Sequence, residues 1–483
     1  MSQLISASDF ATLLACDRRV YLNHHGDPVL RLAPSAYDEW LMQRGQAFEK
    51  QITSGLDFVT PLYLPTDLQQ GFRLTLDFMR NGVPLIYQGV LLADDLVGIP
   101  DLLERVEGAS ALGSYHYQPL DIKLASEARP EHRLQMMAYI ALLEAIQGVR
   151  PRGRLILRLP PAERGGERLY HEETVIFDEA LFAEKLAELR ALAAGDEPQP
   201  FISSECASCP WRGVCLPLAE QNRDASLIPG LRREVWKSLH ARGLGSLPAL
   251  AAASAEEIVS IRGMGEKSAM QIIQQARALT EQRLIPLAPP RLPPPADGEV
   301  FFDVESVPLE GFTYLLGTLV RRGGDYHYEC DVARSPQDEG VMWQGFLRRM
   351  DGHQGAIYHY GAFERTTING LMARYGVDAR AQALLGRMVD ISKVLKASAV
   401  LPLRGYSLKD VAPWLGFTWS EEMQSAGDSM VEYIRWLETG DEQHLERILH
   451  YNEEDLRATL MVRNWLLALA GSTEEGSSSC TER

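Results

Sequence analysis

The stretch Val300–Glu305 reads Val-Phe-Phe-Asp-Val-Glu, an apolar strand that suddenly carries two carboxylates. Asp303 and Glu305 stand at positions i and i+2, so both side chains point to the same face of the strand. Two acids on one face repel each other and cost stability unless a cation lies between them. The stretch therefore predicts a metal site on a strand of an α/β domain.

A second pair of side chains lies near the end of the chain. Tyr451 and Asp455 are at positions i and i+4, which places them on one face of a helix. With Asp303 and Glu305 they could bind two divalent ions that clamp the attacking and leaving oxygens of a phosphodiester. The tyrosine hydroxyl could orient the attacking water. The alternative is a surface turn and a solvated helix face, but the two pairs, in order at the ends of one domain, favour a metal centre.

These residues resemble the DEDD exonucleases, in their tyrosine subclass, on the ribonuclease H-like fold, over most of 298–470. Members of that family carry a further Asp after a strand. Here Glu364 takes that place, with one methylene more, and Asp390 is the runner-up. The resemblance implies degradation of DNA or RNA from the 3′ end. It implies metal-binding roles for Asp303, Glu305, Glu364 and Asp455 and a catalytic role for these four and Tyr451.

A second group of polar side chains lies in the first half of the chain. Asp101 follows Gly-Ile-Pro at the end of one predicted strand, and Asp121 and Lys123 share a face of the next. Two carboxylates can hold Mg²⁺ or Mn²⁺, and a lysine beside them can stabilise the charge that develops on a phosphate. The alternative is a buried salt bridge between Asp121 and Lys123.

These residues resemble the PD-(D/E)xK nucleases of the RecB/Cas4 group. That group has an Asp, then (D/E)-x-K one strand later, and Gln-x-x-x-Tyr on the next helix, where this chain has Gln135 and Tyr139. The resemblance implies catalytic roles for Asp101, Asp121, Lys123, Gln135 and Tyr139. It also implies metal binding by Asp101, Asp121 and Glu49, although many members carry His in place of Glu49.

Four cysteines form a candidate metal site. Three of them form a cluster, Cys206, Cys209 and Cys215, with two and five residues between successive cysteines. Metal sites made of thiolates generally have four ligands. The RecB/Cas4 resemblance supplies Cys16 as the fourth ligand and implies a 4Fe–4S cluster. The alternatives are structural Zn²⁺ and buried free thiols. Cys330 and Cys480 have no expected partner.

Between the two nuclease-like parts lies a segment with a glycine-rich turn. Gly263, Gly265 and Lys267 resemble a helix-hairpin-helix, in which such a turn presents backbone N–H groups to a DNA phosphate. The alternative is an ordinary turn in a helical spacer. Gly-Lys-Ser/Thr of a Walker A loop is absent, so a helicase that works with this protein would be a separate chain.

Length and composition limit the number of domains and the class of protein. The chain has 483 residues, which predicts two large domains and something smaller. A net charge of −17 argues against a passive nucleic-acid coat but not against a nuclease whose sites are themselves acidic. The start lacks a signal-peptide pattern, no apolar run is long enough to span a membrane, and the few cysteines do not form a disulfide framework. We expect a cytoplasmic protein.

We predict a multidomain α/β chain. Its parts are a PD-(D/E)xK restriction-endonuclease-like domain (1–222), a small helix-hairpin-helix-like segment (226–284), a Pro-rich linker (285–297), a ribonuclease H-like domain (298–470) and a disordered tail (471–483). Predicted helices are one from Ser6 or Ser8 through Cys16 to Leu22, 37–53 and 130–146. Predicted strands are 84–92, 95–105, 115–124, 154–159, 299–304, 312–321, 325–332 and 356–360.

The whole chain resembles a bacterial family of RecB-like nucleases that joins these domains. The hypothesis is a nuclease, exonuclease in type, that acts on single-stranded DNA or DNA ends in repair, recombination or defence. The alternatives are a nucleic-acid-binding scaffold with one decayed centre, or a ribonuclease.

Overall fold

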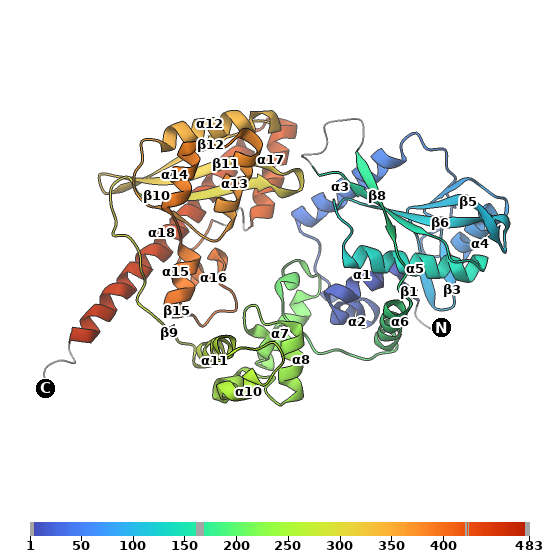
Figure 1. Cartoon of the computed structure of the whole chain (residues 1–483), viewed down its shortest axis with the longest axis horizontal. Coiled ribbons are helices and arrows are strands. Elements are labelled where there is room, and N and C mark those ends of the chain that lie inside the picture. Colours follow the sequence, from blue (N-terminus) through green and yellow to red (C-terminus); the bar gives the residue numbers. More distant parts are fainter. Residues whose placement is uncertain (1–3, 161–168, 421–422, 424, 479–483) are drawn as a thin grey trace. The chain divides into compact units, whose positions relative to one another are not determined.

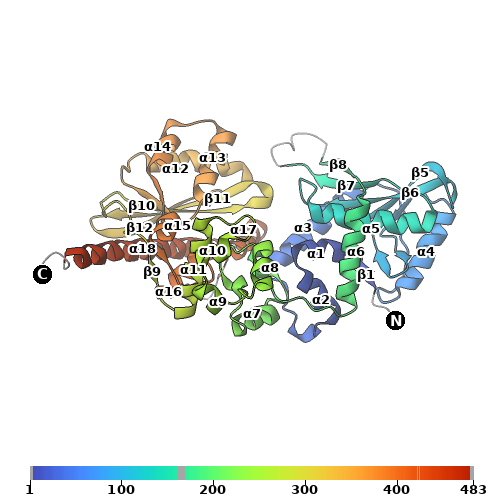
Figure 2. The same ribbon diagram turned by 60° about the horizontal axis from the view of Figure 1, so that its bottom comes forward.

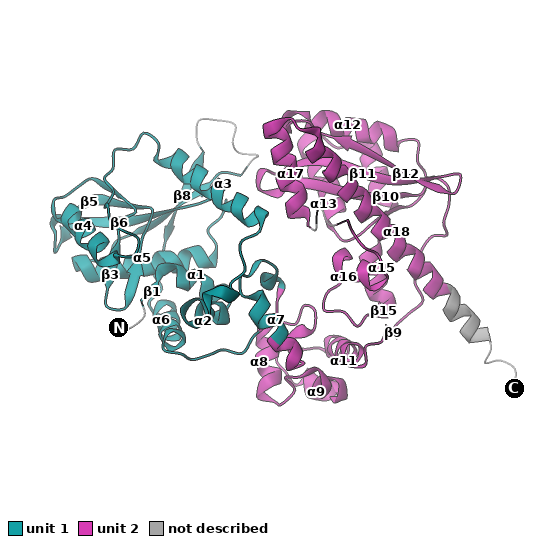
Figure 3. Cartoon of the chain, turned by 180° about the vertical axis from the view of Figure 1, so that it is seen from behind, with its two compact units in different colours: residues 1–200, 204–217 teal, residues 201–203, 218–483 magenta. Residues whose placement is uncertain are grey.

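The computed structural model describes residues 4–160, 169–420, 423 and 425–478. The chain divides into two compact units, which Figure 3 colours separately. Unit 1 holds residues 1–200 and 204–217, and unit 2 holds 201–203 and 218–483. Within the described part of the chain, no helix is both long and apolar enough to cross a membrane. Both units combine helices with a sheet, as the sequence predicted.

Unit 1 is built on a five-stranded sheet in the order β2-β5-β6-β7-β8. Its strands are β2 (Leu85–Tyr87), β5 (Leu102–Ser110), β6 (Gly113–Lys123), β7 (Gly153–Arg158) and β8 (Tyr170–Val175). The central strand β6 runs antiparallel to β5 and parallel to β7. A small second sheet has the order β1 (Ile5–Ser6), β4 (Leu96–Gly98) and β3 (Leu91–Ala93).

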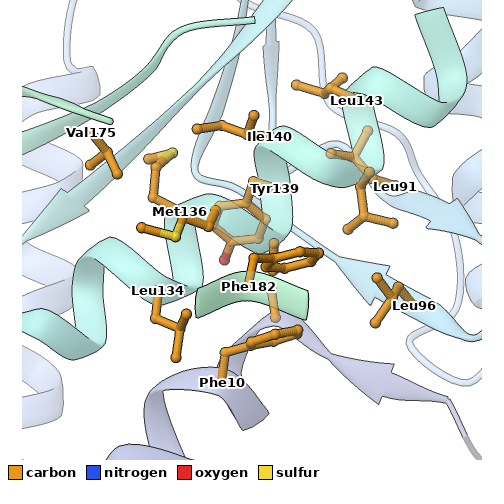
Figure 4. Close-up of a cluster of buried hydrophobic side chains, with 14 of the residues drawn as sticks. Phe10, Leu91, Leu96, Leu134, Met136, Tyr139, Ile140, Leu143, Val175 and Phe182 are labelled. Atoms are coloured by element: carbon orange, nitrogen blue, oxygen red, sulfur yellow. The ribbon is translucent and has the colours of Figure 1, made fainter. Parts of the chain in front are cut away.

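Helices enclose the core of unit 1. They are α1 (Ala7–Ala15), α2 (Asp17–His25), α3 (Ala36–Thr53), α4 (Leu68–Arg80), α5 (Pro130–Gln147), α6 (Glu179–Ala193) and α7 (Arg212–Gln221), the last of which continues into unit 2. Met136 and Tyr139 of α5 belong to one core cluster with Phe10 of α1 and Phe182 of α6 (Figure 4). The rings of Phe10 and Phe182 stack with their centroids 5.2 Å apart. This packing fixes α5, and with it Tyr139, beside the sheet.

Two predictions for unit 1 need correction. The predicted first helix breaks at Cys16, whose extended backbone (φ −165°, ψ 116°) separates α1 from α2. The predicted strands 84–92 and 95–105 are joined by a tight turn, in which Asp94 has a φ of 52°. However, each of these strands is divided, because β3 and β4 pair in the small sheet while β2 and β5 pair in the large one. Gln88, with a φ of 51°, marks the division on the first strand.

The segment 226–284 is helical with short connections, as predicted. Its helices are α8 (Arg233–Ala241), α9 (Leu247–Ala252), α10 (Ala255–Val259) and α11 (Glu266–Glu281). The predicted linker begins with β9 (Ile285–Pro286), which pairs antiparallel with β15 (Ala399–Val400). This pairing joins the helical segment to the following domain, and α11 also contacts β15. Figure 2 shows α11 beside β9.

A second five-stranded sheet follows, in the order β12-β11-β10-β13-β14. Its strands are β10 (Val300–Val307), β11 (Phe312–Arg322), β12 (Asp325–Val332), β13 (Ile357–His359) and β14 (Met388–Asp390). The central strand β10 is antiparallel to β11 and parallel to β13. The four strands that the sequence predicted here are β10 to β13; β14 was missed because it is short.

Helices and a long C-terminal rod complete unit 2 (Figure 1). They are α12 (Glu339–Met350), α13 (Phe363–Tyr375), α14 (Ala379–Arg387), α15 (Ile391–Ser398), α16 (Leu408–Trp414), α17 (Ala426–Thr439) and α18 (Glu442–Ser478). Leu456, Val462 and Leu466 of α18 pack in one core with Phe301 and Leu319 of the sheet. The predicted disordered tail overlaps the end of α18, and 479–483 lie outside the described residues.

Candidate active sites

The centre of unit 2 starts on β10. The apolar residues of this strand are buried, and the strand contacts α18. It carries both Asp303 and Glu305. Asp303 Oδ2 accepts a hydrogen bond of 2.7 Å from Asn452 Nδ2 of α18. Burial raises the pKa of Asp303 well above its usual range, and Glu305, Asp455 and Glu364 raise it further. The electrostatic influence of all three carboxylates places them in one site with Asp303.

Asp455 joins this site from α18. Its Oδ1 accepts hydrogen bonds from Lys409 Nζ at 2.9 Å and from Trp419 Nε1 at 2.6 Å. Burial raises the pKa of Asp455, although Lys409 and Trp419 lower it in part. Burial also raises the pKa of Glu305 to about 8, with Asp455 adding to the effect. Lys409 pairs with Asp455, and among the described residues its ammonium forms no ion pair with the other carboxylates of the site.

Glu364, not Asp390, completes the carboxylate set. Glu364 is buried at the start of α13, and its Oε2 lies 3.3 Å from His359 Nδ1. Neither of these two atoms has a hydrogen-bond partner among the described residues. Asp390 instead caps α15, where its Oδ1 accepts from the backbone N–H groups of Gly361 and Lys393, each at 3.2 Å. The unit 2 centre is defined below as Asp303, Glu305, Glu364 and Asp455.

Tyr451 lies next to the centre and is held by its surroundings. Its side chain is buried, and the ammonium of Lys409 lies 4.3 Å from the ring centroid and 3.8 Å from the ring of Trp419. Burial and the charges of Asp455, Glu305 and Asp303 raise the pKa of Tyr451 far above its usual range. The phenol therefore stays protonated and can act as a hydrogen-bond donor but not as a base.

Sequence reasoning missed three residues of the unit 2 centre. Asn452, Lys409 and Trp419 each contact a carboxylate of the centre, yet no motif contains Lys409 or Trp419. Asn452 directly follows Tyr451, but adjacent helical residues point in different directions, so the motif spacing did not include it. Gly317 of β11 lies opposite Asp303 and leaves the space that Asn452 fills. The tertiary structure alone reveals these contacts.

The unit 1 centre consists of Asp101, Asp121 and Lys123. Lys123 Nζ lies 2.6 Å from Asp121 Oδ2, an ion pair whose carboxylate is buried. Asp101 Oδ2 accepts a hydrogen bond of 2.6 Å from the backbone N–H of Ile122, which ties β5 to β6 at this point. Burial raises the pKa of Asp101 to about 8, with a contribution from Asp121. The predicted trio is brought together.

Glu49, Gln135 and Tyr139 lie around this trio with partners of their own. Glu49 Oε1 accepts from Tyr87 Oη at 2.7 Å and from Gln88 Nε2 at 3.1 Å, and its charge adds to the raised pKa of Asp101. Gln135 Nε2 donates to Tyr139 Oη at 2.9 Å. Asp121 and Asp101 also raise the pKa of Tyr139, after burial, so this tyrosine lies near both carboxylates. Tyr87 and Gln88 were not predicted.

The four predicted cysteine ligands all lie in unit 1. Cys16 separates α1 from α2, Cys206 lies in a 3₁₀ turn (Ser204–Ser208), and Cys215 lies in α7. None of the four forms a disulfide. Burial raises the pKa of Cys215 to about 11, Cys16 and Cys209 raise it further, and Arg18 lowers it. The sulfurs of Cys16 and Cys209 thus each lie within electrostatic reach of that of Cys215. Cys480 lies outside the described residues.

The glycine-rich turn between α10 and α11 has the expected form. Gly263 has a φ of 80°, and Gly265 is the N-cap of α11. Gly263, Gly265 and Lys267 are all exposed. Their accessibility is compatible with contact to a phosphate backbone.

The positions of the acidic side chains and the cysteines bear on metal binding. Among the described residues, no three His, Cys, Asp or Glu side chains converge closely enough to hold a metal ion as they stand, and this includes the cysteines. The chemistry of the two acidic centres nevertheless fits a divalent cation. Besides burial, Asp121 raises the pKa of Asp101, and the other three carboxylates of the unit 2 centre raise that of Asp303, while Glu364 Oε2 has no hydrogen-bond donor among the described residues. A cation would offset this repulsion between carboxylates.

Three families match parts of the chain. Residues 35–216 match the PD-(D/E)XK nuclease superfamily, and residues 300–467 match the RNase H superfamily. The chain is a nuclease. Residues 224–278 match the SAM-like helix-hairpin-helix tandem, which confirms the prediction for the middle segment and implies nucleic-acid binding. Nuclease families of this kind use divalent metals such as Mg²⁺ and Mn²⁺.

No curated protein matches the chain. Among solved structures, an alkaline exonuclease from Laribacter hongkongensis is 16% identical, with 40% of this chain and 86% of that chain covered and a TM-score of 0.19. That score is too low for the likeness to carry an argument. The assignment of the nuclease therefore rests on the family matches and the two acidic centres.

Proposed function

We propose that this nuclease hydrolyses single-stranded DNA or DNA ends at two divalent-metal-dependent centres, as an exonuclease of DNA repair, recombination or defence. The observation that carries the proposal is the unit 2 centre, where Glu305, Glu364 and Asp455 each raise the pKa of Asp303. A buried group of acids with this much mutual repulsion costs stability, and proteins retain such groups where a cation or a reaction needs them.

In unit 2, Asp303, Glu305, Glu364 and Asp455 would hold Mg²⁺ or Mn²⁺. When bound, such ions activate a water and stabilise the charge that develops on the phosphate. The protonated hydroxyl of Tyr451 donates a hydrogen bond and orients the attacking water. Asn452 holds Asp303, and Lys409 with Trp419 holds Asp455, so two of the acids keep one orientation.

In unit 1, Asp101 and Asp121 would hold the ion, with Glu49 behind them. Burial lowers the pKa of Lys123, but Asp121 more than offsets this, so the ammonium stays charged. A charged Lys123 can stabilise the negative charge that grows on the phosphate in the transition state. Gln135 and Tyr139 form a hydrogen-bonded pair that can bind the strand beside it.

Single and double substitutions test this assignment in the full-length chain. With a 5′-labelled and a 3′-labelled dT10 and Mg²⁺ or Mn²⁺, Asp303→Asn should abolish the activity of unit 2 and Asp121→Asn that of unit 1. The matched control is Asp325→Asn, because Asp325 is an exposed acid at the start of β12, opposite Arg322 and so five residues along β11 from Gly317, which lies opposite Asp303. The assignment is wrong if the double variant degrades dT10 as fast as the parent protein.

A second candidate is a nucleic-acid-binding scaffold in which one centre has decayed. Glu364 in place of an Asp favours it for unit 2, and the binding of Glu49 by Tyr87 and Gln88 favours it for unit 1. Calorimetric titration with Mn²⁺ separates the candidates. The Asp303→Asn and Asp121→Asn variants should each lose one set of sites, and a variant that loses none identifies the decayed centre. Assays with rU10 test the ribonuclease alternative.

We propose further that Cys16, Cys206, Cys209 and Cys215 hold a 4Fe–4S cluster, with structural Zn²⁺ as the alternative, that staples the start of unit 1 to its end. The proximity of Cys16 and Cys209 to Cys215 supports this. Protein purified without oxygen should contain iron and sulfide and absorb visible light. Stoichiometric zinc in place of iron and sulfide would replace the cluster proposal.

We propose a location in the cytoplasm, which suits the four cysteines because none of them forms a disulfide. Any unwinding of a duplex would come from a separate helicase.

A further inference from the structure

Unit 2 contains a cavity of about 920 Å³ that reaches the carboxylates of its centre. Asp303, Glu364 and Asp455 line it from the sheet, α13 and α18. The helical segment 226–284 lines it as well, through Arg232 before α8 and Ser268 of α11 among others. The candidate active site of one domain thus has a wall that belongs to another.

This wall is held in place by buried contacts. Gln275 of α11 is buried, and its Nε2 donates to the backbone carbonyls of Leu401 at 2.8 Å and Leu403 at 3.0 Å. Tyr406 Oη donates to Gln275 Oε1 at 2.9 Å and accepts from the backbone N–H of Leu401 at 2.8 Å. A buried amide with all these bonds satisfied fixes α11 against the domain. The cavity is therefore a built feature of unit 2.

Two cations line the cavity, one from each side. Arg232 belongs to the helical segment, and Lys396 belongs to α15 of the domain that carries the carboxylates. Both side chains are exposed, and neither forms an ion pair with a carboxylate among the described residues. A guanidinium hydrogen of Arg232 is donated to the carbonyl of Gly263 at 3.1 Å, so the arginine is anchored to the glycine-rich turn. Exposed cations without acidic partners can neutralise phosphates.

The size of the cavity limits what enters it. Pockets for small ligands measure about 300–1,000 Å³. A space of about 920 Å³ is at the upper end of that range and has room for one or two nucleotides of a single strand. A paired base and its complementary backbone need far more space. The substrate beside the carboxylates is therefore an unpaired strand.

We propose that this cavity binds the terminal nucleotides of an unpaired polynucleotide strand. The phosphodiester to be cut lies at Asp303, Glu364 and Asp455, and Arg232 and Lys396 bind the neighbouring phosphates. The helix-hairpin-helix segment is then part of the exonuclease site and not a separate anchor. This inference rests on the proposed nuclease function of the unit 2 centre.

The test compares a short and a long substrate in the full-length chain with Asp121→Asn, so that unit 2 alone acts. The short substrate is the p-nitrophenyl ester of thymidine 5′-monophosphate, which has no neighbouring phosphate. The long substrate is dT10, with rU10 in parallel to separate DNA from RNA. Arg232→Ala and Lys396→Ala should each raise KM for the long substrate about 3- to 10-fold and leave kcat and the short substrate unchanged. Lys237→Ala, an exposed lysine of α8 outside the cavity, is the matched control.

A second measurement does not depend on catalysis. The anisotropy of fluorescein-labelled dT10 in EDTA gives Kd as a function of KCl concentration, and each substitution should reduce the slope of log Kd by about 0.7. Unchanged KM and salt slopes for both polymers overturn the inference, as does an equal effect of Lys237→Ala. If the parent hydrolyses neither the ester nor dT10, the proposed function fails instead, and the two failures are thus distinguishable.

Discussion

Gly317→Ala tests the architecture of the unit 2 centre without touching a carboxylate. Gly317 lies opposite Asp303 on the neighbouring strand, so a side chain there would point to the same face as Asp303. A Cβ at this position would lie 1.7 Å from Asn452 Oδ1 and 2.7 Å from its Cγ. Ordinary contact begins near 3.4 Å. The amide oxygen of Asn452 must therefore move by about 1.7 Å, the difference of these two distances.

That movement breaks two hydrogen bonds. Asn452 is fully buried on α18, so its side chain must rotate within a packed site. It then loses the 2.7 Å bond from its Nδ2 to Asp303 and the 3.1 Å bond that its Oδ1 accepts from Tyr328 Oη. Overpacking costs about 1–3 kcal/mol and a lost hydrogen bond to a charged group a further ~1.5–3 kcal/mol. We expect the free energy of unfolding of unit 2 to fall by about 2.5–6 kcal/mol, the sum of these two contributions.

The effect on activity should be at least as clear. A displacement of about 1 Å in a catalytic site can reduce the rate about 100-fold. The assay is kcat on dT10 in the Asp121→Asn background, together with thermal unfolding of the same protein. Gly386→Ala is the control, because this helical glycine of α14 has no neighbour within 4 Å of an added Cβ. It should keep both the parent rate and the parent stability.

A double substitution separates the clash from the lost hydrogen bonds. Asn452→Ala removes the atoms that a Cβ at 317 would meet. Gly317→Ala should therefore add little further loss of stability when combined with it, while activity stays low because Asp303 lacks its donor. A Gly317→Ala protein with the parent's melting temperature and rate would refute the reasoning, since the space beside Asp303 would then not be needed.

Three further predictions follow from the same structure. Tyr451→Phe removes the hydroxyl that orients the water, so kcat on dT10 should fall about 100- to 10,000-fold with little change in melting temperature. The control is Tyr433→Phe, which loses the hydrogen bond from its hydroxyl to the carbonyl of Ala333 and should leave kcat unchanged. A Tyr451→Phe protein with the parent's kcat would contradict the role of Tyr451. Burial raises the pKa of Asp101 and of Glu305 to about 8, so between their ordinary pKa and about pH 8 the folded chain binds more protons than the unfolded chain. In EDTA the melting temperature should therefore fall as pH rises over that range, and excess Mg²⁺ should abolish the fall. A melting temperature that does not change with pH in EDTA would argue against the buried acids. The two 2.7 Å hydrogen bonds from Arg190 lower the pKa of Asp95, so this pair contributes stability that is fully present above the ordinary aspartate pKa of 3.8 and is lost as pH falls below it. Asp95→Asn should therefore flatten the loss of stability at acid pH in urea titrations, and an unchanged loss would show that the pair contributes nothing.

Much of the fold could be read from the chain alone. The apolar strand ending in Asp303 and Glu305 became β10, and the predicted strands at 312–321, 325–332 and 356–360 became β11, β12 and β13. The capping residue Ser6 and the helix predicted at 130–146 are likewise present, the latter as α5. These features depend on local patterns of a few residues, which any segment of sequence displays.

The errors lie where long-range pairing decides. The predicted helix through Cys16 is interrupted there, and the hairpin strands 84–92 and 95–105 are each shared between two sheets. Their hydrophobic patterns continue across the breaks, so nothing local marks them. The partner strand or helix that each half contacts determines where the element ends.

The sequence by itself determined which polar side chains share a face, because the i, i+2 and i, i+4 spacings fix the side of a strand or helix on which a side chain lies. Only the tertiary structure decided which residues hold those acids: Asn452 reaches Asp303, and Lys409 reaches Asp455, because distant segments pack together. It also chose Glu364 over Asp390, whose carboxylate caps α15. Spacing along a chain carries no information on contacts between distant segments, and those contacts create the cavity that joins Arg232 to the carboxylates.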